Sequence, residues 1–158
     1  MNDLTKHPQP NSALCFACGL QNPFGLQLRF TDNGVDEVYC DYTIPERFNG
    51  YPGVAHGGIV AAMLDEVVIR TCFIHDHNRF MMTAKMELKY RLPVPTNTPL
   101  TLTGKMVKDR GAIAQAVGEL RLPDGTLAVE ASMAMADMPA EHKVDDAMLT
   151  QLGWKVYP

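Results

Sequence analysis

The segment from residue 56 to about residue 72 constrains the fold most, because it is apolar on nearly every side. Its sequence, HGGIVAAMLDEVVIRTC, is dominated by Ile, Val, Ala, Met and Leu. A helix that is apolar all round has to be buried. Two adjacent carboxylates, Asp65 and Glu66, interrupt the run. The pattern therefore predicts one buried helix with charged side chains near its middle.

Segments with a two-residue alternation lie on both sides of this helix. Two precede it, GLQLRFT and EVYCDYTI, and the turn residues 32–34 join them as a predicted hairpin. Four more follow, over residues 81–92, 100–107, 112–122 and 126–135. The connections are short, which favours antiparallel neighbours. We expect an α+β domain in which a single antiparallel sheet packs against one helix.

The alternation is clearest in residues 81–92. One face of this strand carries Ala84, Met86, Leu88 and Tyr90. The other face carries Thr83, Lys85, Glu87 and Lys89. Because successive side chains of a strand point to opposite faces, we expect the first set to be buried and the second to be in water.

The chain has the size and composition of one globular domain. It has 158 residues, of which 46% are hydrophobic and 20% are charged, so we expect one domain over residues 1–158. Residues 1–24 are predicted to be irregular. Residues 137–158 are predicted to form either a short terminal helix or an arm that covers another part of the molecule.

Charge and hydropathy exclude several classes of partner. The net charge is −4 and no basic stripe is visible, so nucleic acid is not an expected partner. No apolar run approaches the roughly 20 residues of a membrane span, and the polar start does not resemble a signal peptide. We therefore expect a soluble cytoplasmic protein without a membrane partner.

Four cysteines are too few for a disulfide scaffold. Cys15 and Cys18 have CxxC spacing, but a zinc site needs two further ligands. Neither Cys40 nor Cys72 has a close Cys or His partner at a suitable spacing, so we expect no metal. The sequence also contains no G-x-S-x-G motif, which argues against a serine hydrolase.

Two glycines, Gly57 and Gly58, stand at the start of the predicted helix after His56. The first amides of a helix have no intrahelical acceptor, and the helix dipole makes this end positive. Without side chains, the two glycines let a ligand oxygen approach, as an oxyanion hole requires. The alternative is that they only allow the loop to pack tightly against the sheet.

Asp65 needs an explanation, because its neighbours on the helix are apolar. The residues three and four positions away are Ala61, Ala62, Val68 and Ile69. A buried carboxylate without a partner costs several kcal/mol. Glu66 has Arg70 four residues on as an ion-pair partner. Asp65 has no matching cation on the helix, so it caps a backbone group, pairs with a distant Arg, or takes part in chemistry.

The run HGGIVAAMLDE, preceded by FNGYPG and followed by TAKMELKYRLPVP, resembles the hotdog-fold acyl-CoA thioesterases. Within them it is most similar to the branch that includes the phenylacetyl-CoA thioesterase-like proteins. The opening CFACGLQNPFGLQLRF extends the likeness, which covers roughly residues 15 to 136. It implies a hotdog fold, in which a six-stranded antiparallel sheet wraps around a long central helix. This fold agrees with the order of elements expected above.

The resemblance also implies roles for individual residues. Asp65 matches the carboxylate that acts on the thioester carbonyl as general base or nucleophile. Gly57, with Gly58 and the side chain of His56 nearby, matches the end of the helix that polarises the carbonyl. Thr83 matches the hydroxyl residue that positions the water or the carboxylate. Such hydrolysis requires no metal or cofactor.

In this family the active site lies between two subunits. The resemblance therefore implies a homodimer, in which His56 and Gly57 of one chain face Asp65 of the other. Many relatives also pair their dimers into tetramers. One departure concerns Gly50, because several relatives carry a water-ordering Asn or Gln at this position. Asn49, one residue earlier, is the expected substitute.

The expected substrate is an acyl-CoA. Its nucleotide end is expected to meet basic residues and open backbone, and the candidates are Arg91, Lys108, Arg110 and Gly111. Gly58, Asn49 and Glu66 complete the predicted substrate-binding set. The alternative function is a hotdog protein that binds acyl-CoA without hydrolysing it. Hydratase or dehydratase activity is disfavoured, because those hotdog enzymes usually place an Asp and His pair differently.

Overall fold

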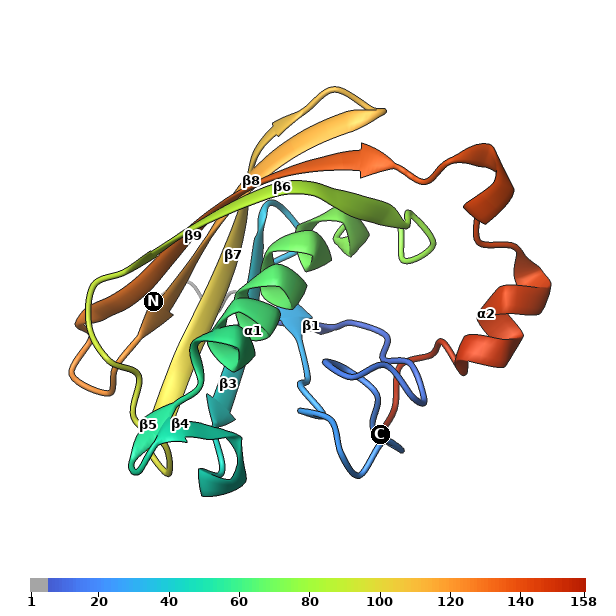
Figure 1. Ribbon diagram of the computed structural model, residues 1–158. Helices are drawn as coiled ribbons and strands as arrows, with labels where there is room; N and C mark the ends of the chain where they lie inside the picture. The colour runs from blue at the N-terminus through green and yellow to red at the C-terminus, as the bar shows by residue number, and fades with distance from the viewer. Residues whose placement is uncertain (1–5) are drawn as a thin grey trace.

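A computed structural model describes residues 6–158. One antiparallel sheet curves around a single long helix, α1 (Gly57–Ile69), as Figure 1 shows. The strand order in this sheet is β1-β2-β3-β7-β8-β9-β6. The strands of this sheet are β1 His7–Pro8, β2 Thr31–Asp32, β3 Glu37–Thr43, β6 Met81–Tyr90, β7 Pro99–Asp109, β8 Ile113–Arg121 and β9 Leu127–Asp137. The hotdog arrangement predicted from the sequence is confirmed, although the sheet has seven strands and not six, because β1, of 2 residues, is added beside β2.

The first predicted strand is mostly irregular. Leu26, Leu28 and Phe30 are buried, as the alternation predicted, but only Thr31–Asp32 pairs as β2. Gln27 has a positive φ of 55°, which breaks an extended strand. The amides of Leu26 and Leu28 instead donate to carbonyls of the N-terminal segment. A burial pattern of period two thus arises here without a strand ladder.

The helix begins with His56 as its N-cap and continues after Ile69 as a 3₁₀ turn, Arg70–Phe73. The predicted span is therefore correct. The buried side chains of α1 are Val60, Met63, Leu64, Val67 and Val68. Gly104 of β7 allows this close packing, because a Cβ there would lie 2.4 Å from the carbonyl oxygen of Val67.

Strand β6 contains a β-bulge. Thr83 pairs with Met135 and Lys85 pairs with Ala134, so Ala84 is the extra residue. The bulge shifts the alternation by one residue, and Thr83 is half-buried while Ala84 is exposed. The prediction that Ala84 is buried and Thr83 lies in water was wrong. Tyr90, also expected on the buried face, is 49% exposed.

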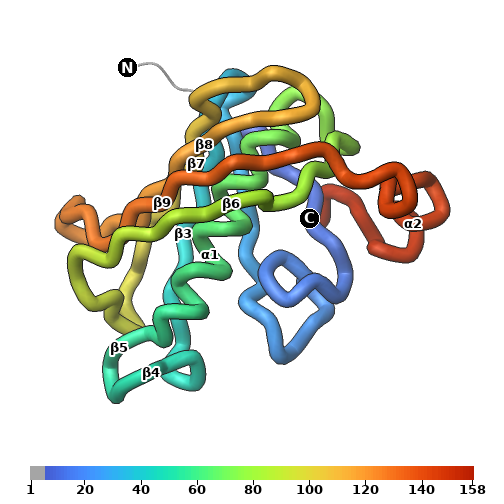
Figure 2. Tube along the Cα trace, turned by 45° about the horizontal axis from the view of Figure 1, so that its top comes forward, coloured from blue at the N-terminus to red at the C-terminus, as the bar shows by residue number. Residues whose placement is uncertain are grey.

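Two short strands, β4 (Asn49–Tyr51) and β5 (Val54–Ala55), form a separate ribbon just before α1. A 3₁₀ turn, Glu46–Phe48, leads into it. Figures 1 and 2 both show this ribbon at the N-terminal end of the helix. The ribbon therefore sets the position at which α1 starts.

The C-terminal segment forms both a helix and a covering arm. After a 3₁₀ turn, Ala140–His142, it forms α2 (Asp146–Leu152) and returns to the N-terminal segment, where Asn11 and Lys155 form a bridge. Both views place the chain end beside this segment (Figures 1 and 2). Trp154 packs against Phe73 with a centroid distance of 5.1 Å. The arm thus closes the core at the far end of α1.

Candidate active site

The N-terminus of α1 presents one unoccupied amide. The ring nitrogen Nδ1 of His56 accepts a hydrogen bond from the amide of Gly58 at 2.9 Å. The amides of Ile59 and Val60 donate to the carbonyl of His56 at 3.0 and 3.2 Å. The Gly57 N–H has no hydrogen-bond partner within residues 6–158, and Gly57 is exposed. Of the two predicted glycines, Gly57 therefore supplies the available donor, while the Gly58 amide is used in the cap.

The same cap determines the tautomer of His56. A neutral imidazole that accepts through Nδ1 carries its proton on Nε2. The His56 ring is exposed, so its Nε2–H is a second donor at this end of the helix. A ligand oxygen at the N-terminus of α1 can thus meet a backbone N–H and a side-chain N–H.

Tyr90 at the end of β6 fixes the first turn of the helix. Its hydroxyl donates to the carbonyl of Gly57 at 2.6 Å. Burial raises the pKa of Tyr90, which keeps the phenol protonated as a donor. A pocket beside Gly57 has mostly apolar walls, formed by Val54, Ala55, Val60, Leu92, Pro93 and Val94 together with Tyr90 and Arg91. Alternation placed Tyr90 among core residues, so its contact with Gly57 was missed.

Asp65 has a specific partner on the neighbouring strand. The hydroxyl of Thr83 donates to Oδ1 of Asp65 at 2.8 Å, and both residues are half-buried. The bulge at Ala84 turns Thr83 toward the helix. Within residues 6–158, Asp65 forms no ion pair and caps no backbone amide. Within the described residues, Asp65 therefore neither caps a backbone group nor pairs with a distant arginine.

Glu66 lies in a different environment from Asp65. It forms an ion pair with Arg70, whose Nε lies 2.9 Å from Oε1, and the Arg70 side chain is fully buried. Arg70 stacks over aromatic rings, with its guanidinium carbon 4.4 Å from the Phe30 centroid and 5.2 Å from that of Trp154. Burial raises the pKa of Glu66 to about 7, despite the opposing charge of Arg70. Glu66 therefore faces the arginine and its aromatic cover, whereas Asp65 faces β6.

Gly57 and Asp65 are far apart within one chain. They are separated by eight residues of continuous helix, which at 1.5 Å per residue is about 12 Å along the axis. An oxyanion donor and a nucleophile or base must each come within about 3 Å of the same reacting group. One copy of α1 therefore does not bring these two groups to one carbonyl.

The loop residues near His56 are held by Glu46. Its carboxylate accepts from the Asn49 side-chain amide at 2.9 Å, from the Gly53 N–H at 3.0 Å and from the Thr96 hydroxyl. These bonds, led by that of Thr96, lower the pKa of Glu46 to about 2. The amide of Asn49, predicted to order water, is thus engaged within the loop. A Cβ at Gly50 would lie 3.2 Å from the Cα of His56, so little room exists for a larger residue.

The predicted basic residues do not form one cluster. Arg91 forms an ion pair with Glu130 at 2.9 Å beside the start of β9, and Arg110 lies in the β7–β8 turn beside its end. That strand is 11 residues long, so it separates them by about 30 Å. Gly111, with a φ of 76°, donates its amide to Asp109 at 3.0 Å and shapes this turn. One nucleotide therefore does not reach both arginines of a single chain.

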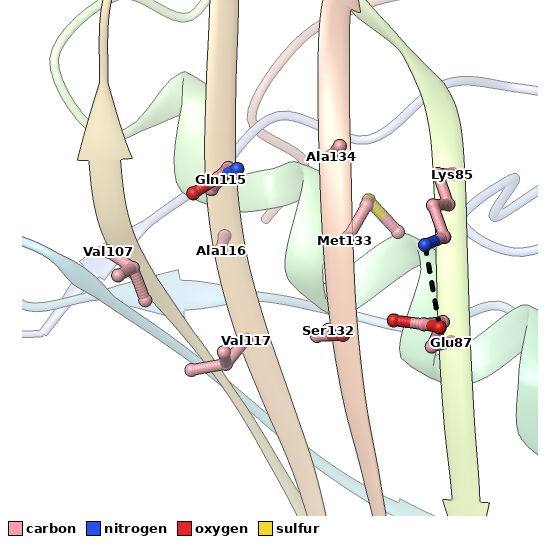
Figure 3. A pocket seen from close by; sticks show the side chains of 9 residues that line it. All are labelled: Lys85, Glu87, Val107, Gln115, Ala116, Val117, Ser132, Met133 and Ala134. Carbon is pink, nitrogen blue, oxygen red and sulfur yellow. Dashed lines mark ion pairs between the residues drawn. The ribbon is translucent and has the colours of Figure 1, made fainter.

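The outer face of the sheet carries a hollow that is separate from these residues (Figure 3). Its lining includes Lys85, Glu87, Val107, Gln115, Val117 and Ser132. Lys85 and Glu87, both on β6, form an ion pair at one side of it at 3.5 Å. Neither Asp65 nor Gly57 contributes to the hollow, because both belong to the helix on the opposite side of the sheet.

Residues 6–158 contain neither a metal-binding cluster nor a membrane-spanning helix. No group of three or more His, Cys, Asp and Glu side chains in this part of the chain is arranged to hold a metal ion. No helix in the same range is long and apolar enough to cross a membrane.

Comparisons with known proteins identify relatives of this chain. Residues 52–129 match the family described as "Thioesterase superfamily". Acyl-coenzyme A thioesterase THEM4 of Bos taurus is 24% identical over 109 residues, which are 68% of this chain and 44% of that protein. The chain spans between 29% and 44% of the length of the curated relatives it matches.

Solved structures share the fold. A crystal structure of a thioesterase superfamily protein superposes with a TM-score of 0.70 and 28% identity, covering 78% of this chain and 60% of that one. A hypothetical thioesterase of Streptococcus pneumoniae TIGR4, crystallised with coenzyme A, superposes with a TM-score of 0.60 and 16% identity, covering 65% and 79%.

Proposed function

Since this chain belongs to the thioesterase superfamily through residues 52–129 and has the hotdog fold, we propose that it hydrolyses the thioester bond of an acyl-CoA. One observation carries the proposal. The carboxylate of Asp65, on α1, accepts a hydrogen bond from Thr83. The Gly57 amide at the N-terminus of the same helix has no partner within the described residues. The acyl-coenzyme A thioesterase activity in the name of the bovine relative supports the reaction, and the coenzyme A in the streptococcal structure supports the substrate class.

The proposed chemistry uses the two groups on opposite sides of the carbonyl. Gly57 N–H and the Nε2–H of His56 stabilise the negative charge that develops on the thioester oxygen. Asp65 accepts a proton from water as the water oxygen attacks the carbonyl carbon, or attacks the carbon itself. The C–S bond then breaks, and the coenzyme A thiolate leaves and takes up a proton. If Asp65 is the nucleophile, its carboxylate is left joined to the acyl group as an anhydride, which water hydrolyses to release the acid and regenerate the carboxylate. Thr83 holds the carboxylate in the orientation for either step.

We propose that each site is shared between two copies of the chain. The separation of about 12 Å between Gly57 and Asp65 along α1 supports this, because two antiparallel helices related by a two-fold axis bring opposite ends together. The edge position of β6 supports it further. An edge strand has a row of unpaired backbone groups that another chain can pair with, and β6 also carries Thr83. The proposed assembly is a homodimer, with further pairing into a tetramer through other faces.

The apolar pocket beside Gly57 is the proposed site of the acyl group. Its walls come from β5, the start of α1 and the residues after β6. Burial of an acyl chain there would place its carbonyl near the Gly57 amide. Arg91 lies on the same pocket and is the proposed contact for a polar group of the substrate.

The reaction is tested by incubating the protein with a panel of acyl-CoAs of different chain length and aromatic content. We expect free thiol, measured with a thiol-detecting reagent, to be released from at least one of them. Asp65→Asn, which is nearly isosteric, is expected to abolish most turnover while binding remains, and Glu66→Gln is the matched control on the same helix. Binding without thiol release from any substrate would instead establish an acyl-CoA-binding protein, and an active Asp65→Asn variant would rule out the assigned carboxylate.

A further inference from the structure

Residues 15–19 bring two thiols onto one turn of the chain. The amide of Gly19 donates to the carbonyl of Cys15 at 2.8 Å and closes a single helical turn. Side chains three residues apart on such a turn have Cβ atoms about 5–6 Å apart. A disulfide requires about 3.5–4.5 Å, so Cys15 and Cys18 can be joined if the turn tightens by about 1–2 Å.

The neighbouring backbone holds this turn in place. The amide of Leu26 donates to the carbonyl of Phe16 at 2.8 Å, and the amide of Leu28 donates to that of Ala17 at 2.9 Å. Both carbonyls belong to the two residues between the cysteines. The irregular segment at residues 25–31, predicted as the first strand, thus forms backbone hydrogen bonds to the CxxC turn.

Two buried polar side chains complete the surroundings of the thiols. The amide group of Asn11 donates to the carbonyl of Cys18 at 2.7 Å. The hydroxyl of Ser12 accepts from the amide of Cys15 at 3.2 Å and lies 3.5 Å from the sulfur of Cys18. Ser12 and Asn11 are each 3% exposed. Backbone and side-chain contacts therefore fix both cysteines, although neither takes part in the proposed hydrolysis.

The two thiols differ in exposure and acidity. Cys15 is exposed and Cys18 is buried. A hydrogen bond from Cys18, with bonds from nearby amides, lowers the pKa of Cys15 from 9.0 to about 6. That bond to Cys15, together with burial, raises the pKa of Cys18 to about 12. An accessible thiolate next to a protonated, protected thiol is the arrangement of an attacking and a resolving cysteine.

We propose that Cys15 and Cys18 form a thiol–disulfide exchange site that reacts with low-molecular-weight disulfides of the glutathione type. The thiolate of Cys15 attacks one sulfur of the disulfide, forms a mixed disulfide and releases one thiolate. Cys18 then gives up its proton and attacks the sulfur of Cys15. The second small thiolate leaves, so the two protein thiols are oxidised to one disulfide and the small disulfide is reduced to two thiols.

The other two cysteines provide internal controls. Cys40 and Cys72 are buried, and burial raises their pKa values to about 12 and about 11. We therefore expect them to remain unmodified in the folded protein. The site does not involve Asp65, so its test is independent of acyl-CoA hydrolysis.

The first test measures alkylation of the full wild-type chain with iodoacetamide as a function of pH, with the modified residue located by peptide mass spectrometry. We expect Cys15 to react first, with a rate that reaches half its maximum near pH 6. A half-maximum above about pH 8, where an ordinary thiol titrates, would overturn the proposal. This measurement requires no variant and so does not depend on the folding of one.

The second test treats the wild type, Cys18→Ser and Cys15→Ser with glutathione disulfide. We expect an intramolecular disulfide between residues 15 and 18 in the wild type, which a small dithiol reverses. Cys18→Ser is expected to stop at the mixed disulfide on Cys15, and Cys15→Ser to react no faster than a buried thiol. The assignment of Cys18 as resolving residue would be contradicted by either of two results. The wild type could accumulate the mixed disulfide, as Cys18→Ser is expected to do, or it could fail to react.

Discussion

Asp65 and Glu66 are adjacent in sequence, yet one turns to a strand hydroxyl and the other to a buried cation. Successive residues of a helix point about 100° apart, so neighbours can serve different surroundings. Glu66 is tied to Arg70, and Asp65 accepts from Thr83. At the scale of the residue, the proposed chemistry therefore belongs to Asp65, whereas Glu66 is paired with a buried arginine.

Replacing Thr83 with Val tests the positioning role of its hydroxyl. A hydrogen bond to a charged group contributes about 1.5–3 kcal/mol, so Thr83→Val is expected to lower kcat about 10–100-fold with little change in KM. Thr83→Ser retains the hydroxyl and is expected to keep most activity. Steady-state kinetics with the best acyl-CoA check this, and equal losses in both variants would show that packing, not the hydrogen bond, is required.

The raised pKa of Glu66 predicts a pH dependence of stability. In the folded protein this pKa is about 7, above its ordinary value of 4.5, so the folded state holds the proton more tightly than the unfolded state. The stabilisation is present below about pH 4.5 and is lost as the pH rises to about 7. Relative to Glu66→Gln, the wild type is expected to lose free energy of unfolding across this interval. Urea denaturation of both proteins measures the difference, and a gain by the wild type would mean that the pair with Arg70 outweighs burial.

Individual residues show what the sequence could and could not predict. The pairing of Glu66 with Arg70 follows from a local spacing of four, and was correct. Thr83 was assigned by family resemblance, whereas alternation placed it in water, because a bulge depends on the partner strand and not on the local pattern. The contact of Tyr90 with Gly57 joins residues 33 positions apart, and no periodicity contains such information.

At the scale of the element, local signals predicted the helix and the long strands but not the first one. The helix signal and its N-terminal glycines lie within one segment, so its span was predicted correctly. Residues 25–31 have the burial period of a strand, but the amides of Leu26 and Leu28 bond to the CxxC turn, which is a tertiary interaction. A burial pattern alone does not show whether a neighbouring strand is available for backbone pairing.

Gly104 tests the close packing of β7 against α1. An added Cβ would lie 2.4 Å from a backbone oxygen of Val67, so the helix would have to move. Gly104→Ala is expected to lower the free energy of unfolding by about 1–3 kcal/mol. Gly118→Ala is the matched control, because its Cβ would meet a side-chain methyl of Val68 at 2.5 Å and not a backbone atom, and we expect a smaller loss. Chemical denaturation of the two variants should separate them, and equal losses would contradict the close approach at Gly104.

At the scale of the whole molecule, the question is how the two halves of the proposed site meet. The N-terminal amide of α1 and Asp65 lie on one rigid helix about 12 Å apart, so no side-chain rotation unites them. The single-chain sequence indicates neither the two-fold axis nor the partner. Only the family resemblance suggested a site shared between two chains, and the helix length supplies a physical reason for it.

Subunit exchange between two inactive variants tests this geometry. Gly57→Leu should block the approach of a carbonyl to the amide. Within residues 6–158, the nearest atom to its Cβ outside the neighbouring residues and the helix backbone is the Tyr90 hydroxyl oxygen, at 3.8 Å, so the fold should tolerate it. Asp65→Asn should lack the base. In a shared site, each mixed dimer contains one intact site and one doubly altered site, and random exchange makes about half of the dimers mixed.

The mixture is therefore expected to recover roughly a quarter of the wild-type thioesterase activity. Exchange itself is measured by mass spectrometry of the intact complexes, with each variant mixed with itself as the control. If mixed dimers form and no activity returns, both halves of the site come from one chain. Such a result would require α1 to bend or break between Gly57 and Asp65 when substrate binds, because the straight helix keeps the two groups too far apart for one carbonyl.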